Sequence, residues 1–375
     1  FVDFKSAFDS VDRQALFTRL DVLGCSSSAL ELLRLLYSNT AAVVRFGNGQ
    51  SDPFTTTAGV RQGCVIAPDL FNSAIDVVIE AIVGDGCSGI EVRGGDKSCI
   101  AYADDVSLLS GDPFDLQHHL DALCTAANLF GLRVNASKTK AMILSRGSTP
   151  DVVPQLTADT GPIEWVNEFV YLGVQLLSPD HAEFASGSLN EIVRRARLAI
   201  TTCWRLSSIW SSGTLSQARK LSLYRSLVRS VLCYGCESWD LSASAVRRLD
   251  AADMICTRRV LSIKWDDFVT NDSIRTQHHL QPLSAWVAVR QLRFFGHVVR
   301  HPEIPVHDVL WEAIGNRQPR DWKRCKGRPR STYVSQLSVI LREVCATPLG
   351  AWKLAGDRSR WRETVDRYDR SRSEA

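Results

Sequence analysis

Two adjacent carboxylates, Asp104 and Asp105, lie in the middle of an apolar stretch with the sequence CIAYADDVSLLS. The apolar residues on either side are typical of two buried strands, so we expect the pair at the turn between them. Burying two carboxylates costs free energy unless a cation neutralises them. Asp3, in the apolar stretch FVDFKSAFD, lies on another predicted strand. Three carboxylates from two distant segments could hold two divalent ions, which is the arrangement used in phosphoryl transfer.

The elements around these carboxylates follow the order of an α+β unit. Leucine spacing indicates the first helix, and Gly47-Asn48-Gly49 supplies residues that accept a positive φ at the tip of a hairpin. This order predicts a split βαβ sheet with helices on one face. In chain order we expect a strand at Asp3, a helix over 15–37, strands over 42–46 and 52–57, a helix over 68–82, the carboxylate hairpin, a helix over 115–130 ended by Gly131, and strands over 141–145 and 168–177.

Beyond Pro179 the pattern is helical. Ser188 and Glu191 have the spacing of a capping box, and the helix that follows presents Arg194, Arg195 and Arg197 away from its apolar face. A second helix over 215–232 carries further basic residues around a leucine stripe, namely Arg219, Lys220, Arg225 and Arg229. Two interpretations stay open for these helices, a solvated surface or a surface that faces nucleic acid.

Length and composition limit the class of protein. A chain of 375 residues, 45% hydrophobic and 23% charged, suits two or three folded domains. It contains no run of eighteen apolar residues and no signal sequence, so we expect an intracellular protein without a membrane span. Its eleven cysteines lack framework spacing and favour free thiols. The chain opens on Phe1 inside a strand pattern, so we expect a fragment of a longer protein.

Positive charge is concentrated in one window, NRQPRDWKRCKGRPR over 316–330, although the whole chain carries a net charge of only +3. Seven Lys and Arg residues stand there against one Asp, which suits a polyanionic partner. Within it, KGRPR resembles the core of an AT-hook, a minor-groove binder, and a generic basic loop is the alternative. The basic residues are Arg317, Arg320, Lys323, Arg324, Lys326, Arg328 and Arg330.

With these motifs in view, the chain resembles a reverse transcriptase of the non-LTR (LINE-type) retrotransposon family. The segments FVDFKSAFDSV, GVRQGCVIAPDLFN, AYADD, GLRVNASKTKAMI and FVYLGV are similar to five motifs of that family, in family order over 1–177. LCYGCESWDL and LRFFGHVVR also look like carboxy-terminal regions of such elements. The resemblance implies a right-hand RNA-directed DNA polymerase: a palm with partial fingers over 1–180 (fingers about 12–58), a helical thumb over 181–240 and a basic nucleic-acid-binding region over 241–375.

The resemblance also assigns roles at the carboxylates. Asp3 and Asp104 would bridge two Mg²⁺ ions, with Mn²⁺ as an alternative, separated by roughly 4 Å. Asp105 would be an auxiliary ligand or would shape the hairpin. A lysine of the fourth motif could protonate the leaving pyrophosphate, and Lys138 is preferred to Lys140.

Three further residues would contact the incoming nucleotide. Phe8 matches the family's bulky ring beneath the sugar, where it would collide with a 2′-hydroxyl, and a core phenylalanine is the alternative. Gln62 and Gly63 match the loop that packs against the nascent pair. Arg61 would contact template or form a salt bridge, and Asp9 would be structural.

The implied partners are template RNA, a DNA primer or target DNA, and deoxynucleoside triphosphates, in a ribonucleoprotein of the nucleus and cytoplasm. Cys233 and Cys236, with His297 and His301, have zinc-like spacing within each pair, but the interval between the pairs is long and buried thiols are the alternative. A transposon-derived relic that only binds nucleic acid, and a maturase-like protein of intron origin, are the other functional hypotheses. The nucleic-acid-binding residues we predict are Arg194, Arg195, Arg197, Lys323, Arg324, Lys326, Arg328 and Arg330.

Overall fold

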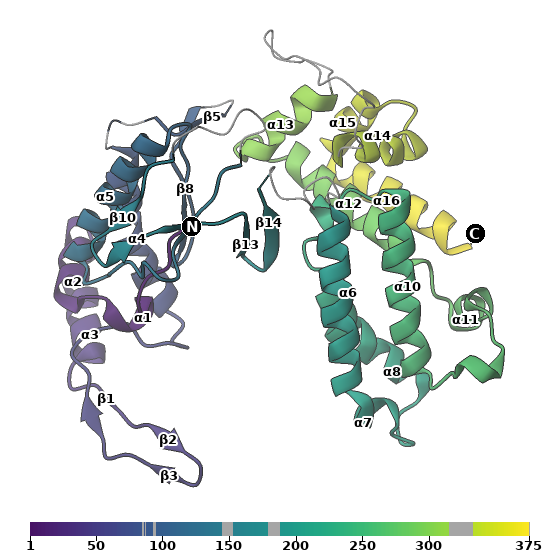
Figure 1. Ribbon diagram of the computed structural model, residues 1–375, viewed down its shortest axis with the longest axis horizontal. Helices are drawn as coiled ribbons and strands as arrows, with labels where there is room; N and C mark the ends of the chain where they lie inside the picture. The colour runs from purple at the N-terminus through teal and green to yellow at the C-terminus, as the bar shows by residue number, and fades with distance from the viewer. Residues whose placement is uncertain are drawn as a thin grey trace. The chain divides into compact units, whose positions relative to one another are not determined.

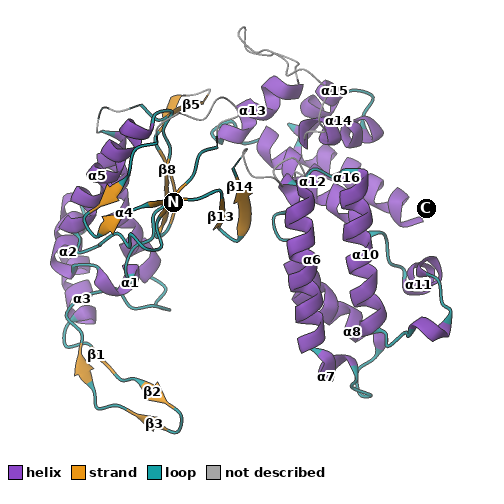
Figure 2. Cartoon of the chain, in the orientation of Figure 1, coloured by secondary structure: helices purple, strands orange, loops and turns teal. Residues whose placement is uncertain are grey.

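The structure is a computed structural model that describes residues 1–84, 86, 88–92, 95–144, 153–178, 188–314 and 333–374. Two compact units, Phe1–His181 and Ala182–Ala375, make up the chain (Figure 1). Helices and short strands alternate in the first, whereas the described residues of the second form helices (Figure 2). The predicted α+β class is confirmed. Within the described residues, no helix has the length and apolar character that crossing a bilayer requires.

Local signals set the helix ends of the N-terminal unit. Asp112 Oδ1 accepts a hydrogen bond from Phe114 N at the start of α5, and Gly131, with φ +72°, follows its end. Ser26 Oγ accepts one from Ala29 N at the start of α3. The helices are α1 (Ala7–Ser10), α2 (Arg13–Val22), α3 (Ser27–Tyr37), α4 (Ala67–Val83) and α5 (Pro113–Leu129).

The strands of this unit pair two by two, all antiparallel except β9 with β12, which are parallel. Isolated bridges from Val2 to Val106 and from Phe4 to Val134 join the first segment to its neighbours. Among the described residues these strands form separate two-stranded pairs, so the predicted split βαβ sheet and the palm topology stay predictions. The strands are β1 (Ala41–Ala42), β2 (Arg45–Phe46), β3 (Gly49–Gln50), β4 (Phe54–Thr55), β5 (Ile90–Val92), β6 (Gly95–Lys97), β7 (Cys99–Tyr102), β8 (Asp105–Leu108), β9 (Lys140–Ala141), β10 (Thr157–Ala158), β11 (Gly161–Pro162), β12 (Glu164–Trp165), β13 (Glu168–Tyr171) and β14 (Val174–Leu177).

Two predicted elements are divided in the structure. The helix expected over 15–37 is two helices, because the chain turns at Gly24, with φ +85°. The strand expected over 168–177 is the hairpin β13–β14, which turns at Leu172 and Gly173, both with positive φ. The hairpin predicted around Gly47 is confirmed, with β2 pairing β3 and β1 pairing β4.

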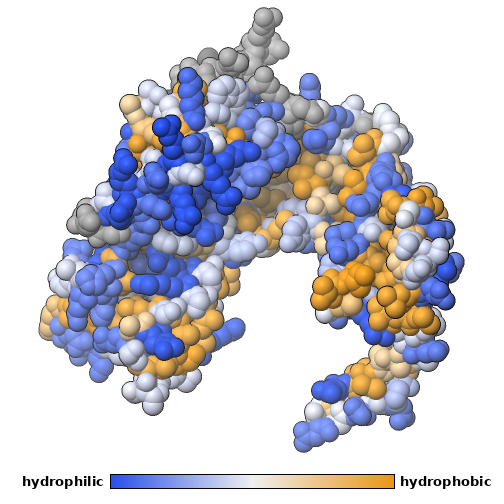
Figure 3. Space-filling model, turned by 180° about the vertical axis from the view of Figure 1, so that it is seen from behind, coloured by the Kyte–Doolittle hydropathy of each residue, from blue (hydrophilic) through white to orange (hydrophobic). Residues whose placement is uncertain are grey.

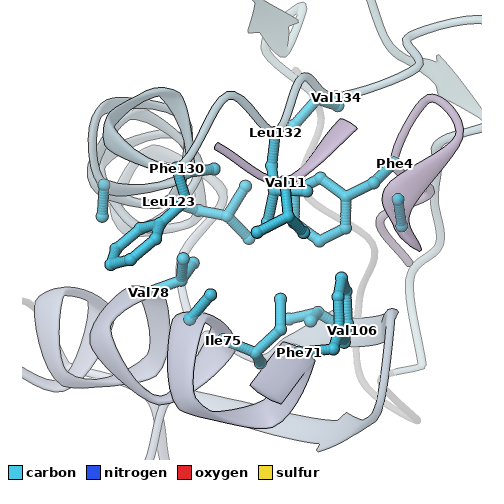
Figure 4. Packing of buried hydrophobic residues seen from close by; sticks show 14 of the residues in the cluster. Phe4, Val11, Phe71, Ile75, Val78, Val106, Leu123, Phe130, Leu132 and Val134 are labelled. Carbon is cyan, nitrogen blue, oxygen red and sulfur yellow. The ribbon is translucent and has the colours of Figure 1, made fainter. Parts of the chain in front are cut away.

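The core of the N-terminal unit lies between α4, α5 and the carboxylate hairpin (Figure 4). Phe71, Val78 and Leu123 are fully buried there, and Val106 of β8 packs into the same cluster. Burying a ring such as that of Phe71 is worth about 2 kcal/mol, and truncating it to alanine costs about 3–5 kcal/mol. This packing fixes the position of β8 and with it the adjacent Asp105.

The β1–β4 hairpin carries little of this core. Val44, Phe46 and Phe54 are exposed on it. Figure 3 shows hydrophobic and hydrophilic side chains interspersed along this projection. The hairpin is attached to the core through its base.

Helices of the C-terminal unit pack in two clusters. One runs from Ile192 to Val287 and includes the adjacent helices α6 and α10, and the other runs from Val289 to Val365. The predicted division at residue 240 between thumb and C-terminal region stays a prediction. The elements are α6 (Ser188–Arg205), α7 (Ser207–Trp210), α8 (Gln217–Tyr224), a π-helical turn (Arg225–Arg229), α9 (Ser230–Leu232), 3₁₀ turns (Cys236–Ser238 and Trp265–Asp267), α10 (Ala243–Val260), α11 (Asn271–His278), α12 (Leu283–Val299), α13 (Pro305–Ile314), α14 (Tyr333–Val344), α15 (Pro348–Ala355) and α16 (Arg358–Glu374).

Candidate active site

Asp3 is held on a short extended segment between β8 and residues 133–135. Val2 N donates to Val106 O over 2.7 Å, and Asn135 N donates to Asp3 O over 2.7 Å. Val2 and Phe4 are buried, so the Asp3 side chain between them points to the opposite face, where it is half-buried. Asp3 N donates to Thr139 Oγ1 over 3.1 Å. Backbone pairing on both sides therefore fixes this carboxylate.

The turn between β7 and β8 presents the other two carboxylates. Tyr102 pairs with Asp105, so Ala103 and Asp104 form the turn itself. Ala103 has φ +53°, the left-handed region that residues with a Cβ rarely adopt. Such backbone strain persists only where surrounding contacts impose it, and it is concentrated at functional sites.

The three carboxylates influence one another. Burial raises the pKa of Asp105 above its usual value, and repulsion from Asp104 and then from Asp3 raises it further. Asp3 Oδ2 is buried and accepts no hydrogen bond. Lys138 Nζ lies 4.0 Å from Asp3 Oδ2, with its own side chain largely exposed. Negative charge in this region therefore exceeds the positive charge that the protein supplies.

A hard divalent cation fits this set of donors in chemistry. Carboxylate oxygens are the ligands that Mg²⁺ prefers, and the buried Asp3 Oδ2 has no donor of its own. Across the described residues, however, no three His, Cys, Asp or Glu side chains are arranged closely enough to hold a metal ion. The structure thus brings Asp3, Asp104 and Asp105 to one region without forming a coordination sphere.

Phe8 packs against the core of the N-terminal unit. Its ring stacks on Phe71 of α4, with centroids 4.4 Å apart and planes inclined by 14°, and it is half-buried. One face of the Phe8 ring is therefore packed in the core. Its predicted contact with the incoming sugar stays a prediction.

The loop over 59–63 packs directly on the segment that carries Phe8. Val60 N donates to Phe8 O over 2.7 Å, and a Cβ on Gly59 would lie 2.6 Å from Asp9 O. Gly59 is therefore required by close backbone approach as well as by its φ of +84°. Gln62 Nε2 donates to both carboxylate oxygens of Asp9 over 3.2 Å. Gly63, with φ +82°, completes the turn.

The N-terminal part of the chain is similar to a known protein family. The family described as "Reverse transcriptase (RNA-dependent DNA polymerase)" matches residues 1–176. Residues 1–176 are a reverse transcriptase domain.

The similarity of this chain to some relatives continues beyond the reverse transcriptase domain. An uncharacterized transposon-derived protein of Caenorhabditis elegans is 23% identical over 74% of this chain and 98% of its own length. A Drosophila melanogaster protein named "Probable RNA-directed DNA polymerase from transposon X-element" is 24% identical over 86% of this chain and 35% of its length. A type-1 retrotransposable element R2 polyprotein of Popillia japonica is 22% identical over 70% and 42%. The chain thus spans less than half of these two retrotransposon proteins.

Arg13 is a structural residue of the reverse transcriptase domain that sequence reasoning missed. Its guanidinium donates to the carbonyl oxygens of Tyr37, Thr56, Ala58 and Gly59 over 2.8–3.1 Å. It also lies over the Tyr37 ring. Its partners are 24 to 46 residues away, so no local pattern identifies it. The role of Arg61 stays open, with its guanidinium 6.0 Å from the centroid of the same ring.

The predicted nucleic-acid contacts beyond the reverse transcriptase domain differ in setting. Arg195 is buried, donates to Glu191 over 2.8 Å and lies over the Tyr234 ring. Arg194 also donates to Glu191, whereas Arg197 is exposed. Burial favours a structural role for Arg195. The basic residues Lys323, Arg324, Lys326, Arg328 and Arg330 lie outside the described residues.

The cysteines with zinc-like spacing are core residues. Cys233 and Cys236 are buried, and burial raises the pKa of the Cys233 thiol to about 12 and that of Cys236 further. His297 and His301 lie with ring centroids 4.3 Å apart, and His301 Nδ1 is 2.7 Å from Glu303. No group of three potential ligands joins either pair within the described parts of the chain.

Proposed function

We propose that this chain is the RNA-directed DNA polymerase of a non-LTR retrotransposon, which adds deoxynucleotides to a primer 3′-hydroxyl on an RNA template. The observation that carries the proposal is the buried Asp3 Oδ2, which accepts no hydrogen bond beside the Asp104-Asp105 turn. Unmatched negative charge at that point suits a site that works with bound cations.

In this proposal Asp3 and Asp104 hold two Mg²⁺ or Mn²⁺ ions, with Asp105 as an auxiliary ligand. When bound, the ions would lower the pKa of the primer hydroxyl and neutralise the triphosphate. Lys138, next to Asp3, donates a proton to the leaving pyrophosphate. Phe8 limits the space for a 2′-hydroxyl, and Gln62 and Gly63 support the nascent pair.

The same proposal extends to architecture and partners. Residues 1–180 would be palm with partial fingers, and the helices that follow would be the thumb and a nucleic-acid-binding region. Template RNA, primer or target DNA and deoxynucleoside triphosphates are the partners, in a ribonucleoprotein of nucleus and cytoplasm. The rival hypothesis is a relic that binds nucleic acid without polymerising.

Primer extension on an RNA template with Mg²⁺ tests both hypotheses. Asp104→Asn should reduce extension by about 10³-fold or more, because the amide cannot hold the ions, while anisotropy of a labelled primer–template shows nearly unchanged binding. Asp76→Asn removes an exposed carboxylate of α4 and is the matched control. Extension by the Asp104 variant at the wild-type rate rejects the assignment, and binding without extension by the wild type favours the relic.

A further inference from the structure

The C-terminal unit contains a cavity of about 250 Å³ whose walls carry arginines. The end of α8 and the π-helical turn supply Tyr224, Arg225 and Arg229, while α10 supplies Asp253 and Thr257. Trp286 of α12 forms another wall. A π-helical turn is rare and frequently marks a functional site.

Three buried polar atoms of the lining residues have no hydrogen-bond partner. Arg229 Nε and Nη2 are buried and donate to no acceptor, and Thr257 Oγ1 has no partner on a side chain that is 1% exposed. A buried donor without an acceptor costs roughly 1–3 kcal/mol, and more when it is charged. All three atoms belong to residues that line the cavity, so a ligand that accepts their hydrogen bonds would remove this cost.

Asp253, a carboxylate among the described lining residues, does not fill this role. Asp253 Oδ1 accepts from Tyr224 Oη over 2.6 Å, and no hydrogen bond links it to Arg229. Burial raises the pKa of Asp253, although Arg229 acts in the opposite direction. Arg275 of α11 also lies near enough to affect Asp253. Arg225 and Arg229 face a single aspartate, Asp253, among the described lining residues, so the balance of charge around the cavity is positive.

The donors are also held in place. The Arg229 guanidinium lies over the Trp286 ring, with Cζ 4.7 Å from the centroid. Thr257 belongs to the middle of a buried helix face, next to Cys256 and Val260 of the same core. A fixed, planar guanidinium beside a hydroxyl suits a tetrahedral oxyanion, because arginine recognises phosphate through two parallel N–H groups.

We propose that this cavity binds a phosphate group through Arg229 and Thr257, with Arg225 at its side. The proposal is independent of polymerase activity. The phosphate could belong to the backbone of a nucleic acid or to a free phosphate compound, and both present the same oxygens. The volume allows a phosphate together with part of what it is attached to.

Calorimetric titration of the full chain with inorganic phosphate, against chloride at equal ionic strength, tests the proposal. Saturable binding is expected for the wild type, about tenfold weaker binding for Thr257→Val and none measurable for Arg229→Gln. Arg219→Gln, an exposed arginine of α8 outside the cavity, is the matched control and should bind as the wild type does. Absence of wild-type binding, or equal binding by Thr257→Val, would overturn the proposal and leave the cavity to water. Thr257→Val carries the test if Arg229→Gln fails to fold.

A labelled single-stranded oligonucleotide separates the two sources. If inorganic phosphate displaces it from the wild type and Thr257→Val weakens its binding, the cavity takes a nucleic-acid phosphate. If phosphate binds but the oligonucleotide binds wild type and Thr257→Val equally, the ligand is a free phosphate compound. Either result supports the cavity as a phosphate site.

Discussion

The carboxylate region of the N-terminal unit and the arginine cavity of the C-terminal unit have opposite deficits. In the first, Asp3 Oδ2 is a buried acceptor without a donor, and in the second Arg229 Nε and Nη2 are buried donors without acceptors. The carboxylates lie on short strands and a strained turn, whereas Arg229 lies in a π-helical turn between packed helices. Unmatched acceptors suit a cation and unmatched donors suit an anion. The atoms that lack hydrogen bonds therefore indicate whether the missing partner carries positive or negative charge.

The largest effect we expect concerns anion binding by a third segment, the basic window over 316–330. If the window contacts phosphates, changing Lys323, Arg324, Lys326, Arg328 and Arg330 to alanine should flatten the slope of log affinity against log salt by up to about 4.5 units on duplex DNA. A salt titration by anisotropy measures this. An unchanged slope would restrict anion binding to other parts of the chain, and a flattened slope with equal affinity for A·T-rich and G·C-rich duplex would reject the AT-hook alone.

The next-largest effect concerns Lys138, whose ammonium group lies beside Asp3. Lys138→Ala should lower the rate of primer extension by about 10²-fold, because the leaving pyrophosphate loses its proton donor. Single-turnover primer extension measures this rate. Lys140→Ala, which removes the ion pair with Glu164, is the matched control and should extend at the wild-type rate. A Lys138 variant that extends at the wild-type rate would leave Lys138 as a surface partner of Asp3.

The next prediction concerns whether Phe8 selects the sugar of the incoming nucleotide. Phe8→Val should raise ribonucleotide incorporation relative to deoxyribonucleotide incorporation by about tenfold, because the clash with the 2′-hydroxyl is removed. Single-nucleotide incorporation kinetics give the ratio. The variant also loses its stacking on Phe71, so its melting temperature should be recorded. Lower stability with an unchanged ratio would make Phe8 a core residue only.

The smallest effect is on stability. The pKa of Asp105 is raised in the folded state, so its ionised form is destabilising, and stability increases as pH falls through that raised pKa. Asp105→Asn, measured in a chelator at pH 7, should therefore melt about 1–2 °C above the wild type, a small gain because the residue is partly solvated. The gain should shrink toward acidic pH, where the wild-type carboxyl is protonated. A lower melting temperature at pH 7 would mean that the protein alone compensates the charge.

The sequence predicted the strands and helices around the carboxylates better than it predicted the turns that divide other elements. The hairpin of Asp104 and the burial of Val106 follow from a short apolar pattern, and α4 and α5 follow from helical spacing. The break at Gly24 and the turn at Leu172 depend on single residues inside patterns that continue on both sides. Neither the π-helical turn nor the burial of Arg195 has a local signal, because both depend on neighbouring helices in the folded unit.

Arg13 has a consequence for motion in the N-terminal unit. One guanidinium joins the end of α3 at Tyr37 to the strand base at Thr56 and to the loop at Gly59, so these segments share a single set of hydrogen bonds. If any one of these segments opens, the Arg13 guanidinium becomes exposed to solvent, and its hydrogen bonds to the other segments are weakened. The hairpin base and the glycine loop should therefore open together as one cooperative unit, with similar hydrogen-exchange protection, rather than as independent loops.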